Sequence, residues 1–239
     1  MAAGAAALAV TAGAVVMLIA LVAPAGSWWD GYVSEAGTAG QPYAIPYRSG
    51  LVVLAAGVGL LGWALRDLRL VGGCLLVSSL LAATSGLVAC SDTCPLPPYE
   101  PSTAADIVHA LASVAGMIVL AGAMAAVWFA RPRPAMTRLA AVGVVLIVPL
   151  GAALGLTMLF VGRSDFGAVV ERLVLVVAVS WLVGTGLTAG VLPPDPRTMP
   201  DRRTSADRGT SPDRGTKPDR RTKPEGAGRV RSGIRRWIP

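Results

Sequence analysis

The chain has 239 residues, of which 54% are hydrophobic and 15% are charged, and its mean hydropathy is +0.60. In soluble domains about a quarter of all residues are charged, so this composition excludes an ordinary soluble enzyme. Residues 1–192 hold 8 basic and 8 acidic residues, whereas residues 193–239 hold 13 basic and 6 acidic ones. The pattern indicates an uncharged membrane domain followed by a polar, basic tail.

Six apolar stretches predict an all-α fold, a polytopic membrane bundle of six transmembrane helices. A helix needs about 20 mostly apolar residues to cross roughly 30 Å of hydrocarbon. Arg66 and Arg69 separate the second stretch from the third, because a merged helix would hold charges at the membrane centre. The first stretch lacks the basic start of a signal peptide, so we interpret it as a span, with a leader cleaved at the small residues Ala23-Pro24-Ala25 as the alternative. The expected spans are about 2–23, 49–65, 70–89, 106–130, 139–161 and 169–192.

The distribution of arginines predicts a multi-pass plasma-membrane protein with both termini in the cytosol. Basic residues accumulate on the cytosolic side of membrane proteins. With this orientation, 18 basic residues are cytosolic, including the tail and Arg66, Arg69, Arg131, Arg133 and Arg138. The opposite side holds Arg48, Arg163 and Arg172.

Two Gly-x-x-x-Gly pairs allow close helix packing. They are Gly151 with Gly155 and Gly186 with Gly190. Small residues four apart lie on one helix face and let two backbones approach. We interpret both pairs as contacts within the bundle, with a dimer interface as the alternative.

Residues 193–239 repeat a polar six-residue unit, with an acidic residue recurring at 195, 201, 207, 213, 219 and 225. The repeat has no apolar face, so we expect a disordered cytosolic tail. Its end combines arginines with aromatic and aliphatic residues, which would allow contact with anionic lipid; a merely solvated basic end is the other interpretation. Acidic residues interrupt the basic run and no aromatics are interleaved with the repeats, which disfavours nucleic-acid binding. The lipid-contacting residues would be Arg229, Arg231, Arg235, Arg236 and Trp237.

Three cysteines occur in the chain. Cys74 lies within the third span and is most simply a small core residue. Cys90 and Cys94 lie in the outer loop that follows, on the oxidising side of the membrane, so we predict a disulfide between them. A metal site would need these thiols together with Asp92 and His109, but the sequence lacks a second Cys pair or a histidine cluster. We therefore predict no metal and no cofactor.

A polar group lies at the outer boundary of the membrane. Asp106 and His109 are three residues apart, hence on one face of the fourth span, and Glu171 and Arg172 lie near the start of the sixth. Capping, snorkelling and an ion pair between helices are the structural interpretation, because acidic residues are favoured at helix N-termini. The functional alternative is an outward-facing polar pocket between spans four and six. No catalytic residue is assigned, because phosphate-binding, dinucleotide-binding and nucleophile motifs are missing.

These motifs support a family resemblance. The segment from Cys90 to Pro95 (Cys-Ser-Asp-Thr-Cys-Pro), then Asp106-Ile-Val-His109, and then Glu171-Arg172 followed by Trp181 resemble the integral-membrane family catalogued as domain of unknown function 998. The resemblance covers about residues 5–192 and excludes the tail. It implies a multi-span bacterial membrane protein with no established activity, and it supplies no catalytic residues.

The leading functional hypothesis is an integral plasma-membrane protein of undetermined activity with a non-enzymatic accessory or assembly role. It rests on the missing catalytic motifs and on a long cytosolic tail that can recruit partners. The alternative is a transporter or ligand sensor that uses Asp106, His109, Glu171 and Arg172. A weaker alternative is an enzyme that modifies outer-leaflet lipids with the same residues.

Overall fold

The computed structural model describes residues 1–24, 29, 31–95 and 99–191. The chain divides into two units, residues 1–193 and 194–239, and all the described residues belong to the first. The lipid-contacting residues expected near the C-terminus lie outside the described part. The regular elements among the described residues are all helices: α1 (Ala2–Val22), a short 3₁₀ helix η1 (Val33–Gly37), α2 (Ala44–Ala64), α3 (Arg69–Leu87), α4 (Ala104–Ala130), α5 (Pro134–Phe160) and α6 (Asp165–Val191).

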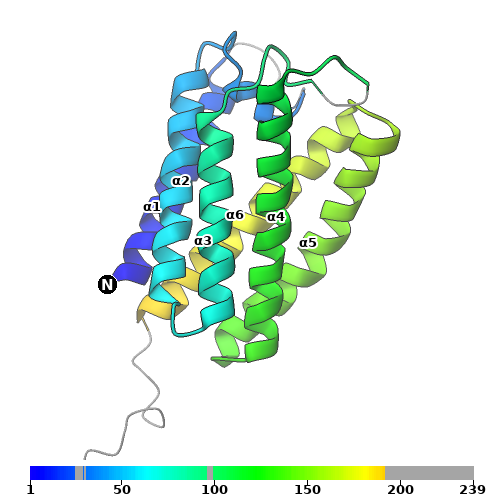
Figure 1. Cartoon of the computed structure of the whole chain (residues 1–239). Coiled ribbons are helices and arrows are strands. Elements are labelled where there is room, and N and C mark those ends of the chain that lie inside the picture. Colours follow the sequence, from blue (N-terminus) through cyan, green and yellow to red (C-terminus); the bar gives the residue numbers. More distant parts are fainter. Residues whose placement is uncertain (25–28, 30, 96–98, 192–239) are drawn as a thin grey trace, which may run out of the picture. The chain divides into compact units, whose positions relative to one another are not determined.

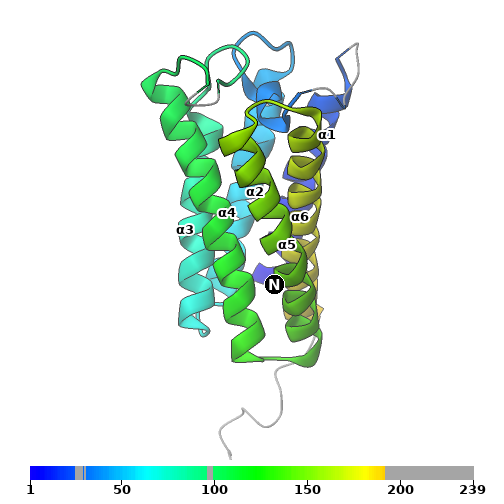
Figure 2. The same cartoon turned by 90° about the vertical axis from the view of Figure 1, so that its right-hand side faces the viewer.

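The six α-helices form a bundle in which each packs against its neighbours in sequence, and α6 returns to α1. All six are long and apolar enough to cross a membrane, which confirms the predicted fold class. Figures 1 and 2 show the helices running alongside one another. We use "loop end" for the end with the α1–α2, α3–α4 and α5–α6 connections. We use "turn end" for the end with the N-terminus and the short α2–α3 and α4–α5 turns.

Several helices begin earlier than the hydropathy pattern predicts. Helix α2 begins at Ala44, five residues before the expected start, and includes Pro46 in its first turn. Proline is tolerated there because the first N–H groups of a helix have no acceptor within it. Arg48 lies one turn further and donates hydrogen bonds to the carbonyls of Gly86 and Leu87 at the end of α3. Its guanidinium thus ties the start of α2 to the end of α3.

The core consists of apolar side chains in the interior of the ring, among them Leu61, Leu75, Met124 and Leu182, which are fully buried. Large apolar side chains also cover the outer surface, as in Ile118 and Phe160, which is the surface that a bilayer requires. Helices α1 and α2 make the closest crossing: a Cβ on Gly13 would lie 2.5 Å from the carbonyl oxygen of Gly50.

The two Gly-x-x-x-Gly pairs behave differently. A Cβ on Gly186 would lie 3.0 Å from the carbonyl oxygen of Ala3, so this pair packs α6 against α1, as expected. A Cβ on Gly151 or on Gly155 would meet nothing within 4 Å. The interpretation of the Gly151–Gly155 pair as a contact within the bundle is wrong. The sequence motif is the same, but the α5 glycines face away from the neighbouring helices.

Candidate functional site

Asp106 organises the connection between α3 and α4. It lies in the first turn of α4, where Thr103 is the N-cap, and its side chain is 1% exposed. The carboxylate accepts hydrogen bonds from the backbone N–H and hydroxyl of Ser91, at 2.7 and 2.9 Å. It also accepts them from the backbone N–H and hydroxyl of Thr103, at 2.8 and 2.7 Å. Four donors therefore surround one buried carboxylate and fix the loop against the start of the helix.

His109 lies one turn deeper on the same face of α4 and is also buried. Its Nδ1 is 2.9 Å from the carbonyl oxygen of Ser85 and 3.1 Å from that of Val88. Because a carbonyl only accepts, Nδ1 carries the hydrogen, and in the neutral imidazole Nε2 keeps the free lone pair. The ring is thus oriented by the last turn of α3.

Cys90 and Cys94 lie beside this histidine. They are joined by a disulfide with Cα atoms 5.0 Å apart, and Cys90 is buried. The two sulfurs and one ring nitrogen of His109 lie within 4.8 Å of one another. The sequence analysis considered these three residues, with Asp92, as a metal site but could not establish that they lie close together, because the path of a loop has no fixed repeat. Their shared position comes from Asp106, which holds the loop over the histidine.

Glu171 and Arg172 bind the first connection at the loop end. The Glu171 carboxylate accepts a hydrogen bond from the backbone N–H of Val33 in η1. The Arg172 guanidinium, in a residue that is 8% exposed, donates to the carbonyls of Gly31 and Ala168 at 3.0 and 2.8 Å. Asp106 and His109 instead bind the α3–α4 connection, and α5 lies between α4 and α6 in the ring. The four predicted residues therefore form two pairs that each hold a different loop.

Arg163, which the sequence pattern did not single out as a site residue, connects the loops. Its guanidinium pairs with Glu35 of η1 and with Glu100, whose carboxylate oxygens lie at 3.3 and 3.2 Å. It also donates to the carbonyl of Thr93 at 2.8 Å. Partial burial opposes the charged form, but the hydrogen bond with Glu100 and the attraction of Glu35 raise the pKa of Arg163. The signal in the sequence was its position, since it lies on the side where basic residues are rare.

The Tyr32 ring packs against the guanidinium of Arg163. The side chain is 3% exposed, and its ring centroid lies 6.0 Å from the guanidinium carbon of Arg163. Burial raises the pKa of the Tyr32 phenol, which therefore stays neutral and donates to the carbonyl of Gly162. Gly162 has a φ of +78°, a conformation that favours glycine. A Cβ on Gly167 would lie 2.1 Å from the Tyr32 hydroxyl, so this glycine makes room for the ring.

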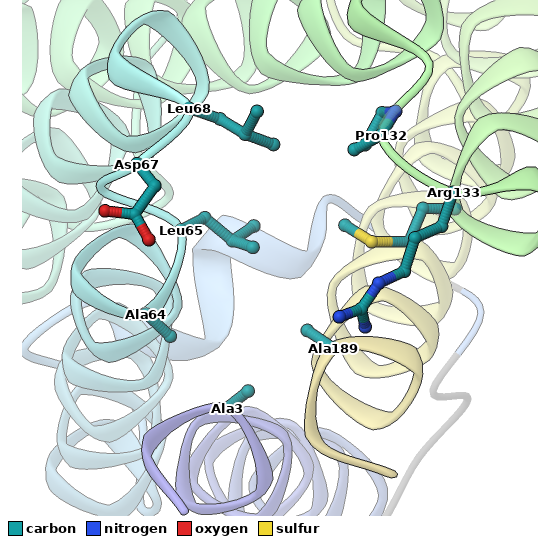
Figure 3. Close-up of a pocket in the computed structure, with 9 residues that line it drawn as sticks. Ala3, Ala64, Leu65, Asp67, Leu68, Pro132, Arg133 and Ala189 are labelled. Carbon is teal, nitrogen blue, oxygen red and sulfur yellow. The ribbon is translucent and has the colours of Figure 1, made fainter. Parts of the chain in front are cut away.

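A separate hollow lies at the turn end, with a volume of about 220 Å³. Figure 3 shows Asp67 and Arg133 at opposite sides of it, with apolar side chains between them. Arg133 donates a hydrogen bond to the carbonyl of Thr188 in α6, at 3.2 Å. The hollow is lined by Ala3, Ala64, Leu65, Asp67, Leu68, Pro132, Arg133, Met136 and Ala189.

Six helices that can span a membrane and three interlinked loops define a polytopic membrane protein, whose described charged residues lie in the connections or near the helix ends. The chain belongs to the family described as "Protein of unknown function (DUF998)", whose model matches residues 2–188. This confirms the resemblance drawn from the Cys90, Asp106 and Glu171 motifs. Neither the curated proteins nor the solved structures contain a match to the chain.

Proposed function

We propose that this chain is an integral plasma-membrane protein with a non-enzymatic accessory or assembly role. In this proposal the loop end faces outward and the turn end faces the cytosol. The charge pattern supports this orientation, because the exposed Arg66, Arg69 and Arg131 lie at the turn end. The three arginines at the loop end are all bonded within the protein.

The observation that carries the proposed role is the network around Arg163. One guanidinium binds residues from the α1–α2 and α3–α4 connections while belonging to the α5–α6 connection itself. Asp106 and Glu171 likewise accept hydrogen bonds from loop backbone. These hydrogen bonds and ion pairs hold the loops in one conformation. A partner protein then binds a preorganised surface at a smaller cost in conformational entropy. We call the three connections bound by Arg163 the cap.

Cross-linking in cells, followed by purification of the tagged full chain in mild detergent, tests this role. We compare the wild type with Arg163→Ala, which removes the centre of the cap, and with Arg138→Ala, an exposed arginine of α5 at the turn end. We expect one membrane protein to co-purify in near-equal amount with the wild type and Arg138→Ala. Its yield should fall by more than half with Arg163→Ala. Equal yield from all three chains would contradict recognition through the cap.

A transporter or ligand sensor is the second candidate. The hollow at the turn end favours it, because apolar walls with a few charged groups, here Asp67 and Arg133, are typical of small-molecule sites. The same purification separates the two candidates, since the co-purified material is analysed for lipids and small molecules as well as proteins. A stoichiometric small molecule that is lost with Arg133→Ala, in the absence of a protein partner, would favour the second candidate.

A further inference from the structure

We propose that Cys90, Cys94 and His109 bind a Zn²⁺ ion when the disulfide between the two cysteines is reduced. The inference is independent of the proposed accessory role. Three ligand atoms, two sulfurs and one imidazole nitrogen, lie within 4.8 Å of one another. A tetrahedral zinc with bonds of about 2.0–2.3 Å spaces its ligand atoms roughly 3.5–3.8 Å apart. Side-chain rotations that separate the sulfurs and bring the ring closer are enough to reach this geometry.

The hydrogen bonding of His109 Nδ1 is that of a histidine which binds a metal through its other ring nitrogen. A histidine that binds a metal usually donates its other ring N–H to a carbonyl or carboxylate, which fixes the tautomer. His109 Nδ1 makes this bond with the carbonyls of Ser85 and Val88. Nε2 is therefore the nitrogen with an available lone pair. The imidazole is held in place by α3 whether or not the cysteines are joined.

The loop that carries the cysteines is also held without the disulfide. Ser91, next to Cys90, is bound to Asp106 through its backbone N–H and its hydroxyl. Thr93 and Cys94 direct their carbonyls to the Arg163 guanidinium, at 2.8 and 3.4 Å. The Cys94 N–H donates to the Ser91 carbonyl at 3.0 Å. Reduction therefore leaves both thiols near His109.

The step balances with a dithiol as the reductant. The dithiol gives two electrons and two protons to the Cys90–Cys94 bond, which becomes two thiols, while the dithiol itself becomes a disulfide. Zn²⁺ then binds both sulfurs as thiolates, and the two thiol protons pass to solvent. Thiolate and imidazole are the ligands that zinc prefers. Asp92 is exposed and its carboxylate lies against Gly40, so water provides the fourth ligand.

Zinc titration of the purified full chain in detergent tests the site. One sample is reduced with a phosphine under anaerobic conditions and desalted, and another stays oxidised. Each is titrated with Zn²⁺ against a chromogenic chelator. We expect one Zn²⁺ per reduced chain and none on the oxidised chain. This comparison uses no substitution, so it does not depend on the folding of a variant.

Variants then identify the ligands. Cys94→Ser and His109→Gln should each weaken zinc binding by more than about 100-fold, since loss of an outer-shell partner alone costs 10–100-fold. Cys74→Ser is the matched control, because Cys74 lies in α3 and is not joined to another cysteine. It should bind zinc as the wild type does. Co²⁺ in place of Zn²⁺ should give the absorption of a tetrahedral thiolate site in the wild type and Cys74→Ser only.

Two results would overturn the proposal. One is a reduced wild-type chain that binds less than one Zn²⁺ under these conditions. The other is zinc binding that persists when Cys90 and Cys94 are both replaced by serine, which would place the metal elsewhere. Gel filtration of each variant in the same detergent confirms that a loss of zinc is not a loss of the folded chain.

Discussion

Asp106 shows how a single side chain in this protein connects a helix to a loop. Its two carboxylate oxygens accept four hydrogen bonds, two from Thr103 at the start of α4 and two from Ser91. An asparagine in its place has one accepting oxygen and an amide group that donates. Amide N–H groups would then face the N–H groups that now point at the carboxylate.

We expect Asp106→Asn to lower the free energy of unfolding by about 2–3 kcal/mol, the range for a hydrogen bond to a charged group that leaves buried donors unpaired. Unfolding in detergent, followed by circular dichroism against temperature and denaturant, measures the change. Asp165→Asn is the control, because Asp165 lies in the first turn of α6 but is exposed. Its effect should stay below about 1 kcal/mol, as for other exposed acids at helix N-termini. Equal losses in the two variants would show that the Ser91 contact adds nothing.

At this scale the sequence allows one part of the site to be predicted and not another. Helical spacing correctly places Asp106 and His109 on one face of α4. Their contacts with Ser91 and Val88 could not be predicted, because residues 88–95 and 99–103 form no helix and such a path has no period. The prediction that Asp106 and His109 group with Glu171 and Arg172 in one pocket stays a prediction.

The comparison of α5 with α6 shows what a helix face contributes. Gly186 lies where α6 crosses α1, with the Ala3 carbonyl oxygen and the Ala7 Cβ each 3.0 Å from the position of an added Cβ. Gly151 in α5 has open space at the same position. Both motifs could be identified from the sequence, but not whether each glycine pair points toward a neighbouring helix or away from the bundle. Both sides of a spanning helix are apolar, so hydropathy does not distinguish the protein side from the lipid side.

We expect Gly186→Ala to destabilise the bundle by about 1–3 kcal/mol, because α1 must move to admit the methyl group. Gly151→Ala should be neutral or stabilising by up to about 1 kcal/mol, because alanine is the better helix former. Thermal unfolding of both variants in the same detergent makes the comparison. A loss in Gly151→Ala as large as that in Gly186→Ala would indicate that α5 packs against a neighbour through this face.

For the whole molecule, hydropathy was sufficient to predict six spanning helices, because the thickness of a bilayer fixes the length of an apolar run. The predicted starts of α2, α5 and α6 lie four or five residues after the observed ones. Helix α6 begins at Asp165, before its apolar run, because acids are favoured in the first helical turn. The bilayer sets where apolar residues must lie, while helices extend beyond it as far as their capping allows.

The proposed orientation predicts opposite locations for two fusion points. A phosphatase that is active only outside the cytosol, fused after Pro101 in the α3–α4 connection, should be active. The same enzyme fused after Leu192 should be inactive, because that point follows the sixth span. A fluorescent protein that matures only in the cytosol should give the reverse pattern. Activity of the phosphatase at both points, or at residue 192 alone, would overturn the proposed orientation.

The position of Arg163 along the chain has a consequence for biosynthesis. Glu35 precedes it by 128 residues, and Thr93 by 70. At about 5–20 residues per second, a ribosome makes Arg163 roughly 6–26 s after Glu35. During that interval the α1–α2 connection lacks the guanidinium that later joins it to the α3–α4 connection. Their final arrangement is completed only after five helices have been inserted, so an ordered loop end marks a chain whose insertion has reached the last hairpin.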